Sequence, residues 1–272
     1  MIKQIVIILI LLFSINITEG SEKKMMKGWD INNWGFNVNF ISNKMNLKEL
    51  NTSLSQYPYS RINENIPLFG FGLKYGKYIP VIDTSEHLEG WEKINNWLYG
   101  HTSMTAAIFF SPNAIFPGMW EYNLRPIIFN IKSCIEIPVT DYFRLKAIIP
   151  SVSYLHYDMV FTKYNAFGEL ESWEEYSSAS LSFGIGAGFD FLITNRYYNE
   201  NKEINRSIVI GVDFEYNFMG TKGRWTDISN GIVVSRTIAG VQPNSFKINL
   251  NFGFEIEKRE PFNFIKEELL NP

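Results

Sequence analysis

The sequence predicts an all-β fold: an antiparallel transmembrane β-barrel of about eight strands, with ten strands as the alternative. Three observations lead to this prediction. Eight segments alternate between apolar and polar residues with a period of two, which is typical of strands with one apolar face. The polar positions carry small residues and balanced charges, whereas the apolar positions carry large aromatic residues. An apolar run at the N-terminus has the length of an export signal.

The composition excludes several other classes of protein. The chain has 272 residues and a mass of 31.6 kDa, and 46% of it is hydrophobic and 16% aromatic, which excludes a disordered chain. Its net charge is -3 and its pI is about 5.7, so we expect no nucleic-acid partner. Mean hydropathy is -0.09, and no apolar run past the N-terminus approaches the roughly 20 residues of a membrane helix. One cysteine and three histidines predict no structural metal. We also expect no cofactor.

The N-terminus is typical of a cleavable signal peptide. Lys3 precedes an apolar stretch from Ile5 to Phe13, and the small residues Thr18 and Gly20 fit the cleavage rule before Ser21. A single membrane anchor is the alternative. The predicted organisation is a signal peptide at 1–20, a lead at 21–33, a barrel at 34–258 and a tail at 259–272.

The alternation defines the expected strands in order along the chain. It is regular from Phe246 to Glu257, where every even position is apolar and every odd position is polar or glycine. The segment 143–157 changes phase near Pro150, and Pro126 also interrupts a strand, so we expect bulges or strand ends at both prolines. The expected strands are 34–40, 69–75, 99–110, 127–137, 143–157, 179–191, 206–218 and 246–257.

The connections predict short turns at one end of the barrel and long loops at the other, which is the asymmetry of bacterial outer-membrane barrels. A tight hairpin is expected to pair Ile137 with Phe143, and 194–203 is a second short link. The link 79–98 is long on the short side, with a helical turn expected at 89–96. The long links are 42–66, 111–121, 159–175 and 219–244.

The dipeptide Asn230-Gly231 is a strong hairpin signal. It predicts that the last two strands extend past the membrane and meet there, with a one-residue bulge at Gly220, Gly240 or Pro243 to keep the apolar residues on one face.

Alternation alone does not separate a membrane barrel from a soluble lipocalin-like barrel, because the two have opposite faces inward and the same pattern. Glycines and serines on the polar face suit a crowded lumen, and the aromatic residues are too bulky to fill one together. We therefore expect the membrane barrel. Six positive and six negative residues lie on or close to the polar face and should pair to plug the lumen. They are Lys74, Arg125, Lys132, Arg144, Lys146 and Lys247, and Glu136, Asp190, Asp213, Glu215, Glu255 and Glu257.

The signal sequence, the eight segments and a final strand at 246–254 resemble the small outer-membrane barrels of the OmpA/OmpX type. The stretch 46–54, followed by Tyr57-Pro58 and Phe69-Gly70-Phe71-Gly72, also resembles a group of uncharacterised barrels of Gram-negative bacteria. The resemblance implies a monomer in the cell outer membrane whose partners are outer-membrane lipid and the barrel-assembly machinery. Such barrels commonly end on an aromatic residue that closes the last strand, whereas here 259–272 follow.

Candidate chemistry is sparse, and we assign no catalytic, cofactor-binding or metal residue. Gly184, Gly186 and Gly188 lie inside a strand pattern, so we interpret them as lumen residues and not as a dinucleotide loop. His101-Thr102-Ser103 is similar to the His-x-Ser of lipid A deacylases, but the expected pairing leaves Glu136 roughly 13 Å from His101.

Two other groups of residues have alternative interpretations. His156 and Asp158 share a parity and could form a polar pair, but we expect ordinary surface at the outer end of a strand. The aromatic residues near strand ends indicate either interfacial girdles or loop packing. They are Trp34, Trp91, Trp97, Trp120, Tyr122, Trp173 and Trp225.

The expected function is structural or interactive: envelope integrity, adhesion or surface contact with extracellular ligands through the long loops. The alternatives are a narrow transport pore, a lipid-modifying enzyme of the lipid A deacylase kind and a soluble lipocalin-like binding barrel.

Overall fold

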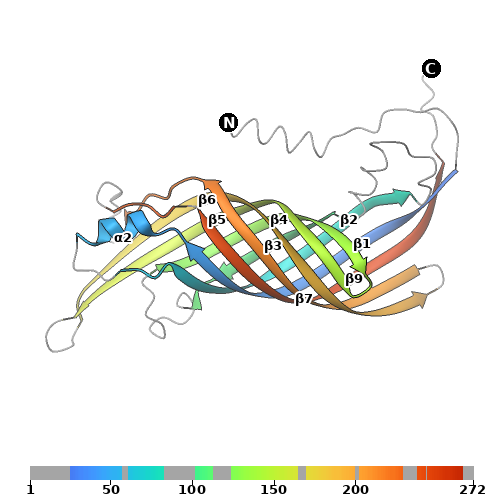
Figure 1. The fold of residues 1–272 in the computed structure, drawn as a ribbon, viewed down its shortest axis with the longest axis horizontal. Coiled ribbons are helices and arrows are strands. Elements are labelled where there is room, and N and C mark those ends of the chain that lie inside the picture. The colour runs from blue at the N-terminus through green and yellow to red at the C-terminus, as the bar shows by residue number, and fades with distance from the viewer. Residues whose placement is uncertain are drawn as a thin grey trace, which may run out of the picture.

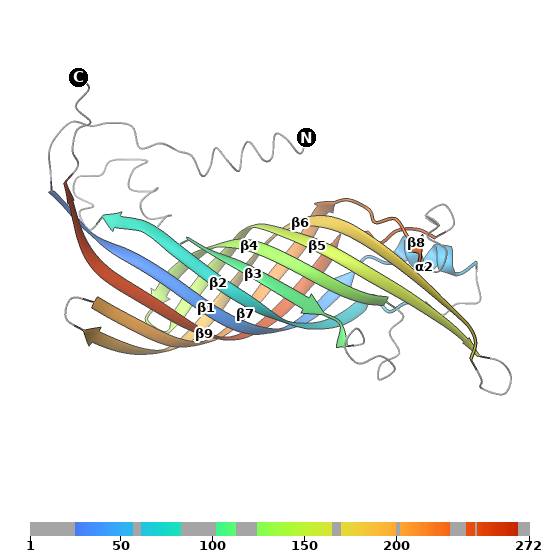
Figure 2. The ribbon, with the colours of Figure 1, turned by 180° about the vertical axis from the view of Figure 1, so that it is seen from behind.

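A computed structural model describes residues 25–56, 61–82, 102–112, 124–164, 170–199, 202–228, 238–242 and 244–265. Eight long antiparallel strands form a closed barrel (Figure 1 and Figure 2). They are β1 (Met25–Met45), β2 (Asn65–Ile82), β3 (Thr102–Phe110), β4 (Leu124–Thr140), β5 (Phe143–Tyr164), β6 (Leu170–Asn199), β7 (Lys202–Gly220) and β9 (Ser245–Ile265). A short helix, α2 (Lys48–Leu54), and a two-residue strand, β8 (Thr226–Asp227), complete the described elements.

Each long strand pairs with its neighbours in sequence, and β1 closes the ring by pairing with β9 from Met25↔Ile265 to Met45↔Ser245. The predicted barrel of about eight strands is confirmed. All eight alternating segments lie wholly or largely within strands. No helix among the described residues is long and apolar enough to cross a membrane.

The strands extend beyond the expected barrel limits of 34 and 258. β1 begins at Met25 and β9 ends at Ile265, so most of the expected lead and half of the expected tail are strand. Alternation marks only the part of a strand whose two faces differ in polarity. Polar stretches such as Lys258-Arg259-Glu260 continue the backbone ladder without continuing the pattern.

The hairpin between β4 and β5 is tight, as predicted, but its expected register is wrong. Asp141 and Tyr142 form the turn, Thr140 pairs with Phe143, and Ile137 pairs with Leu145. A bulge between Pro138 and Thr140 accommodates the shift, which preserves the parity and therefore the apolar face. β6 and β7 are also joined directly, with Asn199 paired with Lys202.

The structure tests one of the features predicted at the loops, the extension of the last two strands, and leaves two others untested. The helical turn at 89–96 and the dipeptide Asn230-Gly231 lie outside the described residues. The last two strands do not continue toward that dipeptide, because β7 ends at Gly220 and β9 begins at Ser245. The segment after β7 instead folds back over the end of the barrel, where Trp225 is fully buried.

Both prolines lie where the prediction placed them. β5 is bulged between Ile148 and Ser151, and Pro150 occupies that bulge, where it interrupts no ladder hydrogen bond. Pro126 lies near the start of β4, beside the point where β3 ends, and its carbonyl accepts a hydrogen bond from Ser111 N at 3.1 Å.

The apolar face points outward, and the polar face lines the lumen. Along β9, Phe252 is 47% exposed, whereas its neighbour Asn251 is 4% exposed. Large exposed apolar residues occur on every long strand, among them Trp34, Leu73, Met104, Phe129, Leu145, Ile185, Ile208 and Phe252. The soluble lipocalin-like alternative requires the opposite orientation and is wrong.

The interior has two zones along its length. Toward α2 it is an apolar core that includes Leu50, Leu68, Leu155 and Trp225. Toward the β4–β5 turn it is filled with charged side chains from six strands. Figure 1 shows α2 and the β4–β5 turn at opposite ends of the barrel.

Cysteine labelling tests the orientation of the two faces. In a Cys134→Ser background, a cysteine at position 252 should react with a lipid-phase probe and be shielded from water-soluble maleimide, because that side chain lies on the apolar exterior. A cysteine at position 251 is the matched control and should be shielded from both reagents. If the cysteine at 252 were also shielded from both, Phe252 would face a packed core and the orientation would be wrong.

Candidate functional site

The polar face brings charged side chains from six strands together inside the lumen. Five cations and five carboxylates point inward, each with a side chain no more than 12% exposed. Their numbers are equal, so the lumen carries no net charge from these groups. The residues are Lys74 on β2, Lys132 and Glu136 on β4, Arg144 and Lys146 on β5, Asp190 on β6, Asp213 and Glu215 on β7, and Lys247 and Glu255 on β9.

Arg144 forms ion pairs with more partners than any other of these ten residues. Its guanidinium lies 2.9 Å from Glu136, 2.6 Å from Asp190 and 2.7 Å from Glu255. Lys74 reaches two of the same carboxylates, at 2.6 Å from Glu136 and 2.9 Å from Glu255. A planar guanidinium can donate in several directions at once, which suits it to link carboxylates on three strands.

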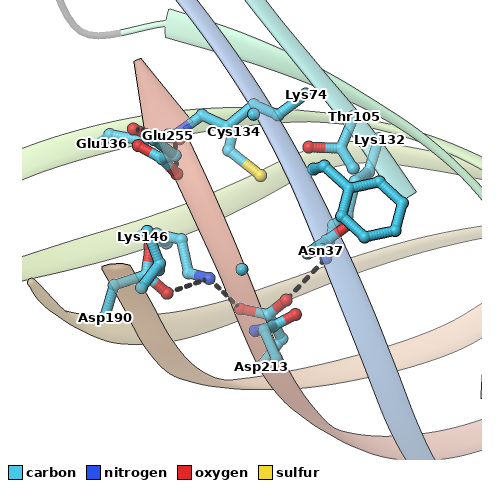
Figure 3. Close-up of a pocket in the computed structure, with 15 residues that line it drawn as sticks. Asn37, Lys74, Thr105, Lys132, Cys134, Glu136, Lys146, Asp190, Asp213 and Glu255 are labelled. Carbon is cyan, nitrogen blue, oxygen red and sulfur yellow. Dashed lines mark hydrogen bonds and ion pairs between the residues drawn. The ribbon is translucent and has the colours of Figure 1, made fainter. Parts of the chain in front are cut away.

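Lys146 extends these contacts to a second group of residues. Its ammonium lies 2.6 Å from Asp190 and 2.6 Å from Asp213, and Lys132 lies 2.6 Å from Asp213 (Figure 3). Lys74, Lys132, Glu136, Arg144, Lys146, Asp190, Asp213 and Glu255 thus form one connected set, here called the ion-pair network.

A separate pair lies beside the network. Lys247 contacts Glu215 at 3.0 Å, and these residues face each other across β7 and β9. Ser151 donates to Glu215 at 2.9 Å, and Lys247 donates to Ser153 at 3.3 Å. Hydrogen bonds with neutral groups thus add to the ion pair, as burial of both charges requires.

Two of the twelve residues expected to plug the lumen do not join its buried pairs. Arg125 is at an odd position on β4, so it lies on the outer face, opposite Asp158. The expectation failed because Arg125 precedes the clear alternation of that strand. Glu257 points to the lumen but lies nearer its mouth, where it contacts Arg259 at 2.7 Å.

The network leaves little space in the part of the lumen that it occupies. The cavity between it and the amides of Asn37 and Asn251 has a volume of about 40 Å³, enough for a few water molecules only. Glycines contribute to this close packing. A Cβ at Gly188 would lie 2.4 Å from the Asp213 carboxylate, and Gly184 and Gly186 are similarly crowded within β6.

The structure corrects the geometry expected for His101-Thr102-Ser103. Ser103 pairs with Cys134, and its hydroxyl donates to Glu136 at 2.5 Å. Lys132 pairs with Thr105, so the expected pairing of the two strands, which placed His101 near Lys132, is wrong. The prediction assumed a different stagger between β3 and β4. Ser103 is 1% exposed and lies beside the network. His101 lies outside the described residues.

His156 and Asp158 form a polar pair at 3.2 Å on the outer face of β5, which was the alternative to ordinary surface. The tryptophans divide between the two interpretations. Trp34 is 60% exposed and lies on the outer face against Tyr75, with ring centroids 4.3 Å apart. Trp225 is buried and donates from Nε1 to the Ala239 carbonyl at 2.9 Å. The side chains of Trp91, Trp97, Trp120, Tyr122 and Trp173 are not among those described.

A second closure, which is not among the expected elements, lies at the opposite end of the interior. It consists of α2 with residues 221–228 and 238–242, here called the outer cap. α2 buries Leu50 and Leu54, and the preceding Leu47 is buried with them. The spacing of these three leucines is that of one helical face and could have indicated the helix.

Polar contacts fix α2 to the rest of the outer cap. Glu49 forms an ion pair with Lys222 and accepts a hydrogen bond from Gln242 Nε2 at 2.6 Å. Ser53 Oγ accepts from Ala239 N at 3.0 Å. The helix is therefore bound to a segment nearly 200 residues later in the chain.

Within the described ranges, no group of three or more histidine, cysteine or acidic side chains could hold a metal ion. Cys134 is a free, buried thiol. The arrangement therefore consists of paired charges and hydrogen bonds that fill the lumen.

Comparisons with known proteins add little to this geometry. No protein-family model matches the chain, and no curated protein matches its sequence. Among solved structures, the outer-membrane protease OmpT from Escherichia coli aligns with 8% identity and a TM-score of 0.27, covering 90% of this chain and 99% of that chain. The translocator domain of the autotransporter NalP from Neisseria meningitidis aligns with 10% identity and a TM-score of 0.29, covering 86% and 88%. Similarity this low does not bear on activity.

The network predicts an unequal cost for removing two carboxylates. Asp213→Asn leaves Lys132 and Lys146 without a shared buried counter-charge, so it should lower the free energy of unfolding by about 3 to 5 kcal/mol. Glu64→Gln breaks the exposed pair with Arg61 and should cost less than about 1 kcal/mol. Urea unfolding of the folded protein in detergent or lipid measures both. Equal, small costs would show that the Asp213 contacts do not support the barrel.

Proposed function

We propose that this protein is a bacterial outer-membrane β-barrel with a structural or surface-interaction role, and that its lumen is closed to solutes. One observation carries the proposal: an apolar exterior surrounds an interior filled by paired charges and covered by the outer cap. A soluble protein rarely exposes large contiguous apolar patches, and a conducting pore keeps an aqueous lumen.

The dimensions of the apolar exterior support the membrane location. On β7 and β9 the outward apolar residues run from Ile208 to Phe218 and from Phe246 to Ile256, in matching registers. Each run is about as long as the roughly 9 to 11 residues of a tilted transmembrane strand. Outward polar residues follow beyond the apolar run of β1, at Ser42 and Lys44.

The asymmetry between short turns at one end of the barrel and long loops at the other supports an orientation of the barrel in the membrane. Outer-membrane barrels have short periplasmic turns and long external loops, so the β4–β5 and β6–β7 turns would face the periplasm and the outer cap would face the exterior. In this orientation the outer cap and long loops provide the surface for contact with extracellular ligands or for adhesion. We propose a monomer, since the eight strands close without a partner edge.

The last strand supports recognition by the barrel-assembly machinery. β9 continues to Ile265 and includes Phe262 and Phe264, so aromatic residues lie near its end after all. We propose that residues 1–20 are the export signal that brings the chain to this machinery. The small plugged barrel supports a likeness to the OmpA/OmpX type.

The geometry favours the structural role over the two alternatives. The ion-pair network argues against a narrow pore, because a conducting path would have to separate several buried ion pairs. Lipid-modifying chemistry at Ser103 has little support, since Glu136 is already paired with Lys74 and Arg144 inside the lumen.

Cell fractionation tests the location. The mature protein should begin near Ser21, fractionate with the outer membrane and migrate on a gel at different positions before and after heating. The heat-dependent migration reports the folded barrel, and N-terminal sequencing reports the cleavage. Recovery of the protein in the periplasm or the medium would contradict the proposal.

Planar-bilayer recording tests whether the lumen is closed. The purified, folded protein should show no stable single-channel steps, because the ion-pair network closes the lumen and leaves room between its side chains for only a few water molecules. Samples verified as folded by their gel migration exclude a trivial negative result. Large, stable steps would favour the pore alternative and contradict the plugged lumen.

A further inference from the structure

A second cavity lies at the end of the lumen near the β4–β5 and β6–β7 turns. Its volume is about 170 Å³, and residues from β4, β5, β6, β7 and β9 line it. Arg144, Glu136 and Glu255 belong to both its lining and the ion-pair network. Because the network closes the lumen on that side, the cavity is a dead end, a shape that suits binding better than passage.

The charges that line this cavity are arranged in pairs. Arg196 contacts Asp141 at 2.9 Å, and Arg259 contacts Glu257 at 2.7 Å. The network residues that line it, Arg144, Glu136 and Glu255, are balanced once Lys74 is included. A neutral set of separated charges favours a ligand that carries both signs over a ligand with net charge.

The two peripheral arginines have unused hydrogen-bond donors. Arg196 contacts its carboxylate through Nη2 and Arg259 through Nε. A guanidinium has five N–H donors. Among the described residues neither side chain makes a further hydrogen bond or ion pair, and Glu203, which pairs with Arg259 in the sheet, acts on Arg196 only through its charge. Their side chains are 43% and 42% exposed, so the remaining donors can reach a carboxylate in the cavity.

Asn205 supplies an acceptor in the same cavity. The residue is 8% exposed, and its Nδ2 donates to Glu203 at 3.1 Å and to Glu257 at 3.3 Å. Its Oδ1 is buried without a donor. A buried acceptor of this kind requires a donor, and an ammonium or amide N–H of a ligand could provide it.

From this arrangement we infer that the cavity binds a small zwitterion with an α-carboxylate and an adjacent nitrogen, either a free amino acid or the C-terminal end of a short peptide. The carboxylate accepts from Arg196 and Arg259. The nitrogen donates to Asn205 Oδ1 and lies near Glu257. This inference goes beyond the proposed function and does not depend on where the barrel resides.

Equilibrium dialysis of the full-length folded protein in detergent tests the site with labelled glycine and labelled glycylglycine. At least one probe should bind saturably, and the stronger of the two identifies the source as a free amino acid or a peptide end. Acetate and methylammonium, which each carry half of the zwitterion, should compete poorly. Absence of saturable binding by both probes, or competition by acetate as strong as by unlabelled glycine, would overturn the inference.

Three variants locate the binding. Arg196→Gln and Arg259→Gln should each weaken binding about tenfold or more, since each removes a charged hydrogen-bond donor. Lys258→Gln is the matched control, because Lys258 precedes Arg259 on β9 but is exposed on the outer face. It should bind as the unmodified protein does. Heat-dependent gel migration confirms that each variant is folded, and equal affinities in all three would place binding elsewhere.

Discussion

The pairing of buried charges is the constraint on which the rest of this barrel depends. Where the exterior is apolar, charged residues of the strands must lie in the lumen, and an isolated buried charge costs several kcal/mol. Ten charged side chains meet this constraint through short contacts between strands. A one-residue slip of any strand would turn its charges outward and its aromatic residues inward. The ion pairs therefore help to define the register.

The ion-pair network and the outer cap close the interior by different physical means. The network is specific in direction, because each contact needs a partner of opposite sign at hydrogen-bond distance. The outer cap depends on apolar burial around Leu50 and Trp225, which is less directional and more tolerant of shape. The two closures lie one after the other along the barrel axis, so the interior stays closed if one of them is lost. This arrangement fits a barrel whose stability matters more than passage through it.

Alternation was sufficient to identify the strands, because a period of two reports which face each residue occupies. It located the phase change at Pro150 and placed Asp213 and Lys247 on the lumen face. It could not report the stagger between strands, which determines the residue opposite each position. For this reason the pairing of Ile137 with Leu145 and the contact between Ser103 and Glu136 were not predicted.

The parts that the sequence did not reveal depend on contacts between distant segments. α2 is only seven residues long, and its position depends on Lys222, Gln242 and Ala239. The prediction for Arg125 is wrong for a local reason. Arg125 lies beside an alternating segment, and its charge does not place it on the polar face of that segment. The cavity near Arg196 and Arg259 likewise involves side chains from five strands. Neither the position of α2 nor this cavity follows from a one-dimensional pattern.

A double-mutant cycle on Lys247 and Glu215 tests most directly whether inward charges stabilise the barrel by pairing. This pair is separate from the network and faces across adjacent strands, so Lys247→Met and Glu215→Gln remove few other contacts. Unfolding free energies of the two single variants and the double variant give the coupling energy. The account predicts a favourable coupling on the order of 1 to 3 kcal/mol. A coupling near zero would contradict it, because the two charges would then be stabilised independently of each other.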